Sequence, residues 1–450
     1  MIEETVSRLW WHRYLRHACS WRELDEFPCL SPTEQQRVLA ERMRAQIKYF
    51  GRREDALPGW REAAEVRDAT ELWRVWPTLP IVDRQLLQTV FDARELQARF
   101  HLEGAINTTG GSTGEPSAFL HDPPMLRACF TSTIYTRLKM GWQPGMATLA
   151  IWGSERDIGK ETGLGVRLHH RLLRSFLVGG YNLTSETVER VLAVIRRHAP
   201  VAIYGFTSML EFVARTVTEK GLQPPPGCVR TAWNGGEMLF DEQSAVFRQA
   251  FGVPVLNLYG GRELSAMACQ FFGGGPLRIL RPWLFVEIVD DQGKPVGPGE
   301  SGRLLWTSTI CRGTPFLRYD VGDLGVFAHT HQDESGISAL AQLHGRVAGV
   351  LKLPNGKNVN CLYWNHLFKE MREVRQFQVI LKRDGSLKLL LKGTGFTPRR
   401  EAELRATIGD FTGGLPLQVS WVDKIPLTPQ GKLVQVVNES RSHEPSRDAG

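Results

Sequence analysis

The alternation of helical and strand patterns between about residues 100 and 330 is the feature that most constrains the fold. Residues 185–198 carry apolar side chains at helical spacing and stop before a proline. Residues 201–206 then form the apolar run of a buried strand. The alternation repeats through residues 229–261, where VPVLNLYGG is predicted as one further strand. This order predicts an α/β fold with a parallel sheet, whose loops at the strand ends can carry a site.

The sequence pattern changes after Arg346. Two apolar runs within residues 376–393 flank an Asp-Gly pair, which predicts a hairpin, and a helix and a last strand are predicted after it. Three parts are therefore predicted: a large multi-layer α/β N-terminal domain over residues 1–345, a small α+β domain over residues 346–437, and a disordered tail over residues 438–450.

Composition excludes several classes of protein. With 42% hydrophobic residues in 450, the chain can build a core, and no stretch reaches the roughly 18–20 apolar residues of a membrane span. The first residues lack the pattern of a signal peptide, so a cytoplasmic protein is predicted. The net charge of +7 comes from scattered arginines among acids, which predicts no nucleic-acid partner. The seven cysteines are never spaced as CxxC, which indicates reduced thiols.

A glycine-rich loop, Asn107–Pro116, is the most conspicuous local segment. Its three glycines permit tight or left-handed turns, and its four hydroxyl groups lie among backbone N–H groups. Because these donors can converge on one point, such a loop is suited to bind an anion, usually a phosphate.

Other interpretations of this loop fit the sequence less well. A kinase-type P-loop needs Lys followed by Ser or Thr after its last glycine, where this chain has Glu115 and Pro116. Gly110, Ser112 and Gly114 match the spacing of a hydrolase nucleophile elbow, but Pro116 would interrupt the helix that must follow. A purely structural turn remains an alternative.

A possible metal motif lies at His329, His331 and Asp333. Glu334 stands where a further histidine would be required, and metal sites need three or four suitable ligands. A solvated loop is therefore predicted here, and no metal is assigned to it.

The glycine-rich loop resembles the phosphate loop of the adenylate-forming superfamily, roughly TSGTTGKP. Further segments resemble that family's motifs in the family's order: Gly235–Glu237 (GGE), Tyr259–Glu263 (YGxTE), Pro315–Asp323 (PLIRYxxGD), His344–Arg346 (HGR) and Pro426–Lys432 (PxTxxGK). The resemblance covers about residues 75–435 and is strongest to the phenylacetate–CoA ligase branch and its relatives among capsular polysaccharide biosynthesis (CapK-like) proteins.

The resemblance implies an ATP- and Mg²⁺-dependent ligase. Such an enzyme joins a small carboxylic acid to AMP, releases pyrophosphate, and passes the acyl group to the thiol of CoA or of a carrier protein's phosphopantetheine. The small C-terminal domain would be a mobile lid. The resemblance also implies nucleotide-binding positions, which are Thr109, Gly110, Gly111, Ser112, Thr113, Gly114, Gly235, Gly236, Glu237, Tyr259, Gly260, Asp323 and Arg346.

Individual roles also follow from the resemblance. Tyr259 would stack on the adenine, and Asp323 would accept hydrogen bonds from the ribose hydroxyl groups. Glu263 would bind Mg²⁺, an ion that prefers oxygen ligands. Arg262 would hold the α-phosphate, and Lys432 would bridge the substrate carboxylate and that phosphate. Taken singly, these residues could also be turn caps, helix-end acids or solvated lysines.

Three positions depart from the family pattern. Glu115 places an acid in the phosphate loop, Arg262 stands where many members have threonine, and Ala348 follows the HGR motif where a hinge aspartate or lysine is common. The acyl acceptor therefore stays open between a thiol, an amine, a hydroxyl group and a protein side chain. A degenerate nucleotide-binding protein is the non-enzymatic alternative.

The acid itself is only loosely indicated by the sequence. Phe206, Trp233 and Met267 lie near predicted strand ends and favour an apolar or aromatic acid, although such residues more often belong to a core. The sequence does not predict an oligomeric state.

Overall fold

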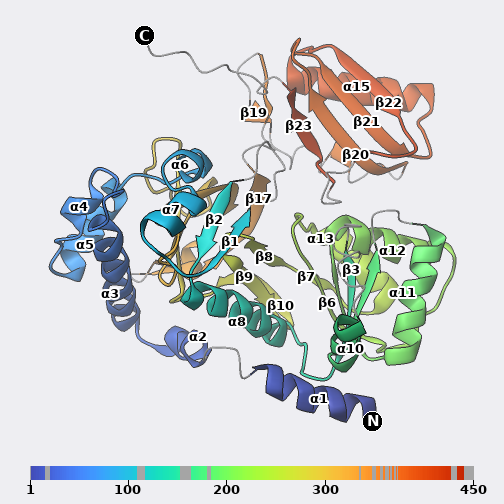
Figure 1. The fold of residues 1–450 in the computed structure, drawn as a ribbon. Helices are drawn as coiled ribbons and strands as arrows, with labels where there is room; N and C mark the ends of the chain where they lie inside the picture. The colour runs from blue at the N-terminus through green and yellow to red at the C-terminus, as the bar shows by residue number, and fades with distance from the viewer. Residues whose placement is uncertain are drawn as a thin grey trace. The chain divides into compact units, whose positions relative to one another are not determined.

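A computed structural model of the chain describes residues 2–15, 21–108, 117–152, 164–179, 184–333, 336–346, 351–354, 358–359, 364, 367–368, 371, 373–426 and 433–439. The chain divides into two compact units, Met1–Leu343 and His344–Gly450. The sequence-based boundary lies between residues 345 and 346. Each unit is described by itself (Figure 1).

A five-stranded parallel sheet forms one layer of the large unit, in the order β4-β3-β5-β6-β7. Its strands are β3 (Ala147–Trp152), β4 (Ser175–Gly179), β5 (Val201–Gly205), β6 (Val229–Asn234) and β7 (Val255–Leu256). Three helices share an apolar core with one face of this sheet: α11 (Ser185–His198), α12 (Thr207–Glu219) and α13 (Asp241–Phe251). The predicted parallel α/β arrangement is confirmed.

The ends of these helices follow from local sequence. Thr184 and Thr187 form a reciprocal capping box at the start of α11. Gly252, in the left-handed region at φ 77°, ends α13, and Gly221, at φ 61°, directly follows the last turn of α12. The helix predicted over residues 185–198 has those bounds in the structure.

Two four-stranded sheets built from antiparallel strand pairs also belong to the large unit. One has the order β16-β10-β9-β8, and the other has the order β11-β12-β13-β17. Their strands are β8 (Leu258–Gly261), β9 (Ser265–Phe271), β10 (Gly274–Ile279), β16 (Ala339–Leu340), β11 (Leu284–Val289), β12 (Gly302–Ser308), β13 (Tyr319–Val326) and β17 (Gln342–Arg346). The division between the two units falls within β17.

The segment VPVLNLYGG is not the single strand that the sequence predicts. It divides at Asn257 into β7, which runs parallel to β6, and β8, which runs antiparallel to β9. Asn257 donates its N–H to Oε1 of Gln270 and accepts the Gln270 N–H at its carbonyl. These two bonds to β9 remove residue 257 from the parallel sheet, so one continuous segment serves two sheets.

Helices and short strands precede and connect these sheets. The helices are α1 (Ile2–Leu15), α2 (Arg22–Glu26), α3 (Pro32–Gly51), α4 (Trp60–Ala63), α5 (Ala69–Val75), α6 (Arg84–Thr89), α7 (Ala93–Arg99), α8 (Pro123–Lys139) and α10 (Leu164–Leu172), with 3-10 turns at Phe27–Cys29, Trp76–Thr78 and His329–His331. The strands are β1 (Ala105–Thr108), β2 (Ala118–His121), β14 (Gln332–Asp333) and β15 (Gly336–Ile337). No helix among the described residues is long and apolar enough to cross a membrane.

The small unit contains a four-stranded mixed sheet, β22-β21-β20-β23, and the helix α15. Its elements are β18 (Leu351–Lys352), β19 (Asn358–Val359), β20 (Val374–Leu381), β21 (Leu387–Gly393), α15 (Pro398–Thr412), β22 (Leu417–Trp421) and β23 (Val436–Asn438). The predicted hairpin turns at Gly385, φ 81°. Asn438, predicted to begin the tail, instead pairs with Leu381 as the last residue of β23. Residues 440–450 lie outside the described residues.

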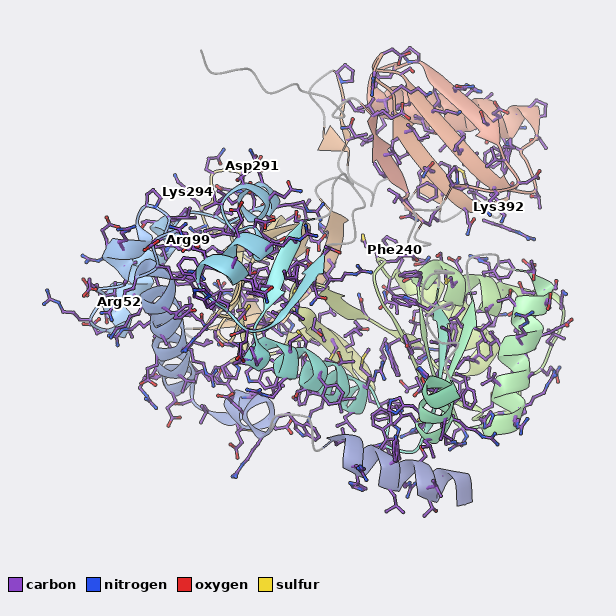
Figure 2. All side chains as sticks on the ribbon, viewed as in Figure 1. Arg52, Arg99, Phe240, Asp291, Lys294 and Lys392 are labelled. Carbon is purple, nitrogen blue, oxygen red and sulfur yellow. The ribbon has the colours of Figure 1, made fainter. Side chains whose placement is uncertain are left out.

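Charged side chains of both signs are interspersed on the surface of the large unit. Arg52, Arg99, Asp291 and Lys294 project outward (Figure 2), and Arg99 pairs with Glu54 at 2.7 Å. Such pairs at exposed positions contribute little to stability.

A buried ion pair connects the helical N-terminal segment to the second antiparallel sheet. Arg318 is 2% exposed, and its Nε lies 3.2 Å from both carboxylate oxygens of Glu287. The guanidinium also donates to the carbonyls of Pro77 and Leu79, and Trp76 Nε1 donates to Glu287 at 3.0 Å. Burial raises the pKa of Glu287, while the charge of Arg318 opposes that rise. The pair therefore depends on both partners being present.

We expect Arg318→Met to lower the free energy of unfolding of the large unit by about 3–5 kcal/mol, because it leaves a carboxylate buried without its cation. Urea unfolding followed by tryptophan fluorescence measures the change. Arg37→Met is the matched control, since Arg37 pairs with Glu41 at an exposed i, i+4 position and its loss should cost less than about 0.5 kcal/mol. Equal effects from the two variants would contradict the structural role of Arg318.

Candidate active site

A fully buried asparagine organises the carboxyl end of the parallel sheet. Asn234 is the last residue of β6, and its side chain is 0% exposed. Its Nδ2 donates to Thr207 Oγ1 at 3.1 Å and to the Glu237 carbonyl at 2.8 Å. Its Oδ1 accepts the Leu258 N–H at 3.0 Å. One side chain therefore holds together the start of α12, the GGE turn and the start of β8. Ligands of open α/β sheets bind at this end of the strands.

The GGE turn, Gly235–Glu237, follows Asn234 directly. Gly235 N–H donates to the Gly205 carbonyl at 3.0 Å, and Gly236 has φ 73°. The Glu237 carboxylate accepts the Ser208 N–H at 2.8 Å and the Ser208 hydroxyl at 3.1 Å. Because Ser208 lies in the first turn of α12, this carboxylate caps the helix. The adenine-binding role implied for this turn stays a prediction. The cap uses the Glu237 side chain, so the backbone of the turn is the part that could contact an adenine.

An aromatic pair lies beside this turn. The ring of Trp152, at the end of β3, stacks on Phe206 with centroids 4.1 Å apart. A Cβ atom placed on Gly235 would lie 3.6 Å from the same ring. The carboxyl ends of three neighbouring strands therefore meet around Trp152.

The YGGRE and RYDVGD motifs come together through a hydrogen bond. Tyr259, in β8, donates its hydroxyl to Oδ2 of Asp323, in β13, at 2.7 Å. The Tyr259 ring also lies 5.8 Å from the ring of Trp306. Gly260 is required for this placement of β8, because a Cβ atom there would lie 2.3 Å from the Ser265 carbonyl oxygen. Two positions 64 residues apart in the sequence are thus in contact.

The glycine-rich loop connects β1 and β2, which pair as a hairpin with Thr108 opposite Ala118. The predicted phosphate-binding residues, Thr109, Gly110, Gly111, Ser112, Thr113 and Gly114, lie outside the described residues. The end of β1 is placed next to the YGGRE segment, because Arg262 Nη1 donates to the Thr108 carbonyl at 3.4 Å. The role of Arg262 on an α-phosphate stays a prediction.

Two predicted site residues belong to the small unit. Lys432 lies outside the described residues, and Arg346 ends β17 with a side chain that is likewise outside the description. Their predicted roles remain untested. Glu263 directly follows Arg262, and its backbone carbonyl contacts Nε2 of His121 at 2.7 Å. Sequence reasoning missed His121, which ends the strand after the loop.

Two of the residues predicted to line an acid pocket belong to the core instead. Trp233 is 1% exposed and stacks on Tyr204 with centroids 5.7 Å apart, and Met267 is buried in β9. Their positions on interior faces of β6 and β9 explain the difference. Phe206 is buried as well, but it stacks on Trp152 beside Gly235.

The HxHxD segment is described only in part, since Glu334 lies outside the described residues. His329 to His331 form a short 3-10 turn. Across the described part of the chain, no group of three or more His, Cys, Asp or Glu side chains is arranged to hold a metal ion.

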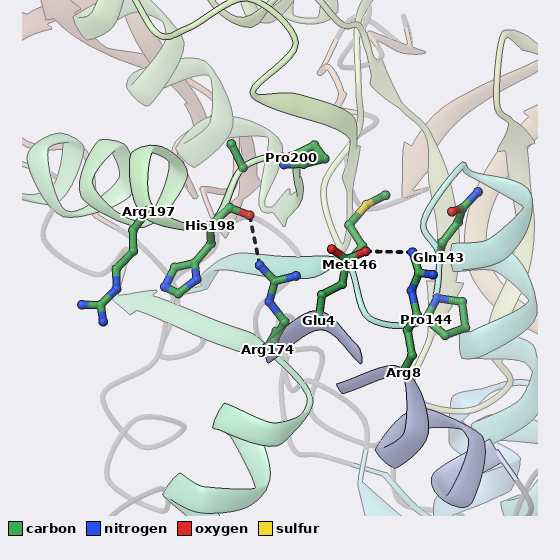
Figure 3. A pocket seen from close by; sticks show the side chains of 10 residues that line it. Glu4, Arg8, Gln143, Pro144, Met146, Arg174, Arg197, His198 and Pro200 are labelled. Carbon is green, nitrogen blue, oxygen red and sulfur yellow. Dashed lines mark hydrogen bonds and ion pairs between the residues drawn. The ribbon is translucent and has the colours of Figure 1, made fainter. Parts of the chain in front are cut away.

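A pocket of about 650 Å³ lies at the opposite end of the parallel sheet (Figure 3). Arg8, Arg174, Arg197 and His198 line it, and Arg8 pairs with Glu4 at 2.8 Å. Arg174 donates to the carbonyls of Gly145 and His198, and these two bonds connect the loops at the amino end of the sheet. This pocket is therefore separate from the candidate active site around Asn234.

Comparisons with known proteins agree with the motif order. Residues 164–311 match the family model described as AMP-binding enzyme. The chain is 24% identical over 307 residues to a phenylacetate-coenzyme A ligase of Thermus thermophilus, covering 65% of this chain and 64% of that protein. It is 28% identical over 141 residues to the Pseudomonas putida phenylacetate-coenzyme A ligase, covering 30% and 32%. The matched stretch thus spans just under two thirds of the Thermus thermophilus protein and about one third of the Pseudomonas putida protein.

Solved structures share the fold. A 2-hydroxyisobutyryl-CoA ligase in its postadenylation state has a TM-score of 0.67 at 17% identity, covering 90% of each chain. An anthranilate CoA ligase bound to anthranoyl-AMP has a TM-score of 0.55 at 17% identity, covering 73% and 64%. An amide bond synthetase from Marinactinospora thermotolerans has a TM-score of 0.52 at 20% identity, covering 72% and 66%.

The match of residues 164–311 to the AMP-binding enzyme model and the fold shared with these ligases confirm the resemblance to the adenylate-forming superfamily that the motifs indicate. The two relatives described above are phenylacetate-CoA ligases.

The two glycines of the GGE turn should respond differently to substitution. Gly236→Ala places a side chain in the left-handed region and should lower the free energy of unfolding by about 1–2 kcal/mol. Gly235→Ala adds a methyl group at ordinary contact distance from Trp152 and should change it by less than about 0.5 kcal/mol. Urea unfolding of both variants checks the turn, and the reverse ranking would refute its described conformation.

Proposed function

We propose that the protein is an ATP-dependent carboxylic acid ligase that forms an acyl-adenylate and transfers the acyl group to a thiol, either CoA or a carrier-protein phosphopantetheine. The contact that carries this proposal is the 2.7 Å hydrogen bond from Tyr259 to Asp323. It places a ring suited to stack on adenine next to a carboxylate suited to accept ribose hydroxyls, within a fold shared with adenylate-bound ligases.

The described residues fit ATP. The Gly235–Gly236 backbone, Tyr259 and Asp323 offer an adenosine site, and Arg262 beside Thr108 offers a cation at the root of the glycine-rich loop. Glu263 directly follows Arg262, and its carboxylate offers the oxygen ligands that Mg²⁺ prefers. Glu263 would therefore hold Mg²⁺, and the bound ion would neutralise charge on the phosphates. The fit rests on the chemistry of this donor set.

In the first half-reaction, an oxygen of the substrate carboxylate attacks the α-phosphorus of ATP. The new O–P bond forms as the bond to the bridging oxygen breaks, and its electron pair leaves with pyrophosphate. Negative charge on the phosphoryl oxygens must be neutralised in the transition state. Arg262 and Lys432 are the cations that we assign to this task.

In the second half-reaction, the acceptor sulfur attacks the acyl carbonyl, AMP leaves, and the thiol proton is released. We infer that the small unit is the mobile lid that separates the two half-reactions. An amide bond synthetase shares the fold, so an amine acceptor is the second candidate.

The acid is proposed to be aromatic or apolar. The stacked rings of Trp152 and Phe206 lie at the carboxyl ends of β3 and β5, next to the proposed adenine turn. Such a wall would contact a flat or apolar acyl group favourably.

Pyrophosphate exchange tests the first half-reaction. We expect labelled pyrophosphate to enter ATP only when Mg²⁺ and a suitable aryl or fatty acid are present, with EDTA abolishing the signal. Lys432→Ala should reduce the exchange rate by at least about 100-fold, because it removes a cation from the transition state. The control Lys392→Ala changes a lysine of the small unit with no assigned role.

The outcomes separate the alternatives. An unchanged rate in folded Lys432→Ala would remove that lysine from the mechanism. Absence of exchange with every acid, together with absence of ATP binding, would favour the degenerate nucleotide-binding protein.

The acceptor is tested by mass spectrometry of the product formed with the best acid. We expect an acyl thioester when CoA or a phosphopantetheine-loaded carrier protein is added. An amide formed with an amine, and no thioester with either thiol, would favour the alternative acceptor.

A further inference from the structure

A buried histidine joins the strands of the glycine-rich loop to the YGGRE segment. His121, the last residue of β2, is 3% exposed. Its Nε2 lies 2.7 Å from the Glu263 carbonyl oxygen, and its Nδ1 lies 3.3 Å from Asn107 Nδ2. A carbonyl oxygen only accepts a hydrogen bond, and an amide nitrogen only donates one. Nε2 therefore carries the proton, and Nδ1 accepts.

The surroundings pack closely around the ring. The Phe119 ring packs against it with centroids 4.9 Å apart, and Cys129 Sγ lies 3.9 Å from Nδ1. The ring thus has one tautomer and one orientation.

The two residues that His121 joins each lie next to a segment that the resemblance assigns to ATP binding. Asn107 lies in β1, two residues before the loop segment that begins at Thr109, and Glu263 follows Arg262 in the YGGRE segment. Arg262 Nη1 makes a parallel connection to the Thr108 carbonyl at 3.4 Å. Two adjacent residues of β1 are therefore linked to two adjacent residues of the YGGRE segment, one link passing through a rigid ring.

We propose that His121 is a positioning residue that holds the Arg262–Glu263 backbone in register with the strands of the glycine-rich loop. The inference rests on the proposed function, in which those two segments bind the phosphates and Mg²⁺ of one ATP molecule. Since His121 contacts the backbone of Glu263 and the side chain of Asn107, it acts through them. Its loss should affect the use of MgATP and spare the binding of the acid.

A histidine suits this task because its donor and acceptor lie on opposite edges of one ring. Glutamine can still donate to the Glu263 carbonyl, but its acceptor oxygen lies at the same end as its donor and does not replace Nδ1. Phenylalanine keeps the aromatic packing and removes both hydrogen bonds. The two substitutions therefore form a graded series.

We expect His121→Phe to raise the KM for MgATP by roughly tenfold, in line with the loss of hydrogen bonds inside a buried site. His121→Gln should recover part of that loss. The KM for the acid should change by less than about twofold in both variants. Cys129→Ala is the matched control, because it touches the same ring without joining the two segments, and it should behave as wild type. Steady-state pyrophosphate exchange provides these constants.

Two readouts are independent of activity. In wild type labelled with ¹⁵N-histidine, the His121 signals, assigned by their disappearance in His121→Gln, should show the proton on Nε2 and a hydrogen bond accepted at Nδ1. Amide hydrogen exchange of residues 260–266 should be faster in His121→Phe than in Cys129→Ala.

The outcomes distinguish this proposal from the proposed function. Absence of exchange by wild type with every acid would refute the ligase, while a protonated Nε2 and faster exchange at residues 260–266 would still support the register. An active wild type combined with an unchanged KM for MgATP in His121→Phe would overturn the positioning role. Equal rises in the KM for the acid and for MgATP would indicate general structural damage and would also overturn it.

Discussion

The hydrogen bonds of Asn234 are the constraint on which the candidate site depends. The parallel sheet can supply strand ends, but it does not by itself fix the loops beyond them. A single buried amide holds the α12 start, the GGE turn and β8 together. Because an unpaired buried amide is costly, the three segments are held as one set rather than independently.

The division of one segment at Asn257 extends this arrangement into the second sheet. β7 completes the parallel sheet, and β8 carries Tyr259 toward Asp323 of the third sheet. Arg318 directly precedes β13, and its ion pair with Glu287 holds the start of that strand. The proposed nucleotide site thus lies where three sheets meet, and each sheet contributes one motif.

The sequence was sufficient for the elements that local rules determine. The capping box at Thr184 and the αL glycine after α13 fix helix ends through contacts within a few residues, and α11 has the bounds predicted for it. The division at Asn257 was missed because it depends on Gln270 in another strand. Likewise, Trp233 and Met267 were assigned to a pocket because apolar residues at strand ends look alike until the faces of the sheets are known. His121 gave no signal, since a lone histidine has no pattern.

Motif matching also does not reveal which atoms of a motif reach a ligand. The Glu237 carboxylate of the GGE turn is bonded to Ser208, in the first turn of α12, and Arg318 of the RYDVGD motif is buried against Glu287. Both side chains serve the fold, whereas Tyr259 and Asp323 lie at the meeting point of the strands. If the nucleotide binds there, the backbone of the GGE turn contacts it. The Glu237 carboxylate then acts indirectly, by holding that backbone in place through Ser208. The motif residues therefore separate into side chains that hold the fold and side chains that we propose to bind the nucleotide, a distinction that needs the three-dimensional contacts.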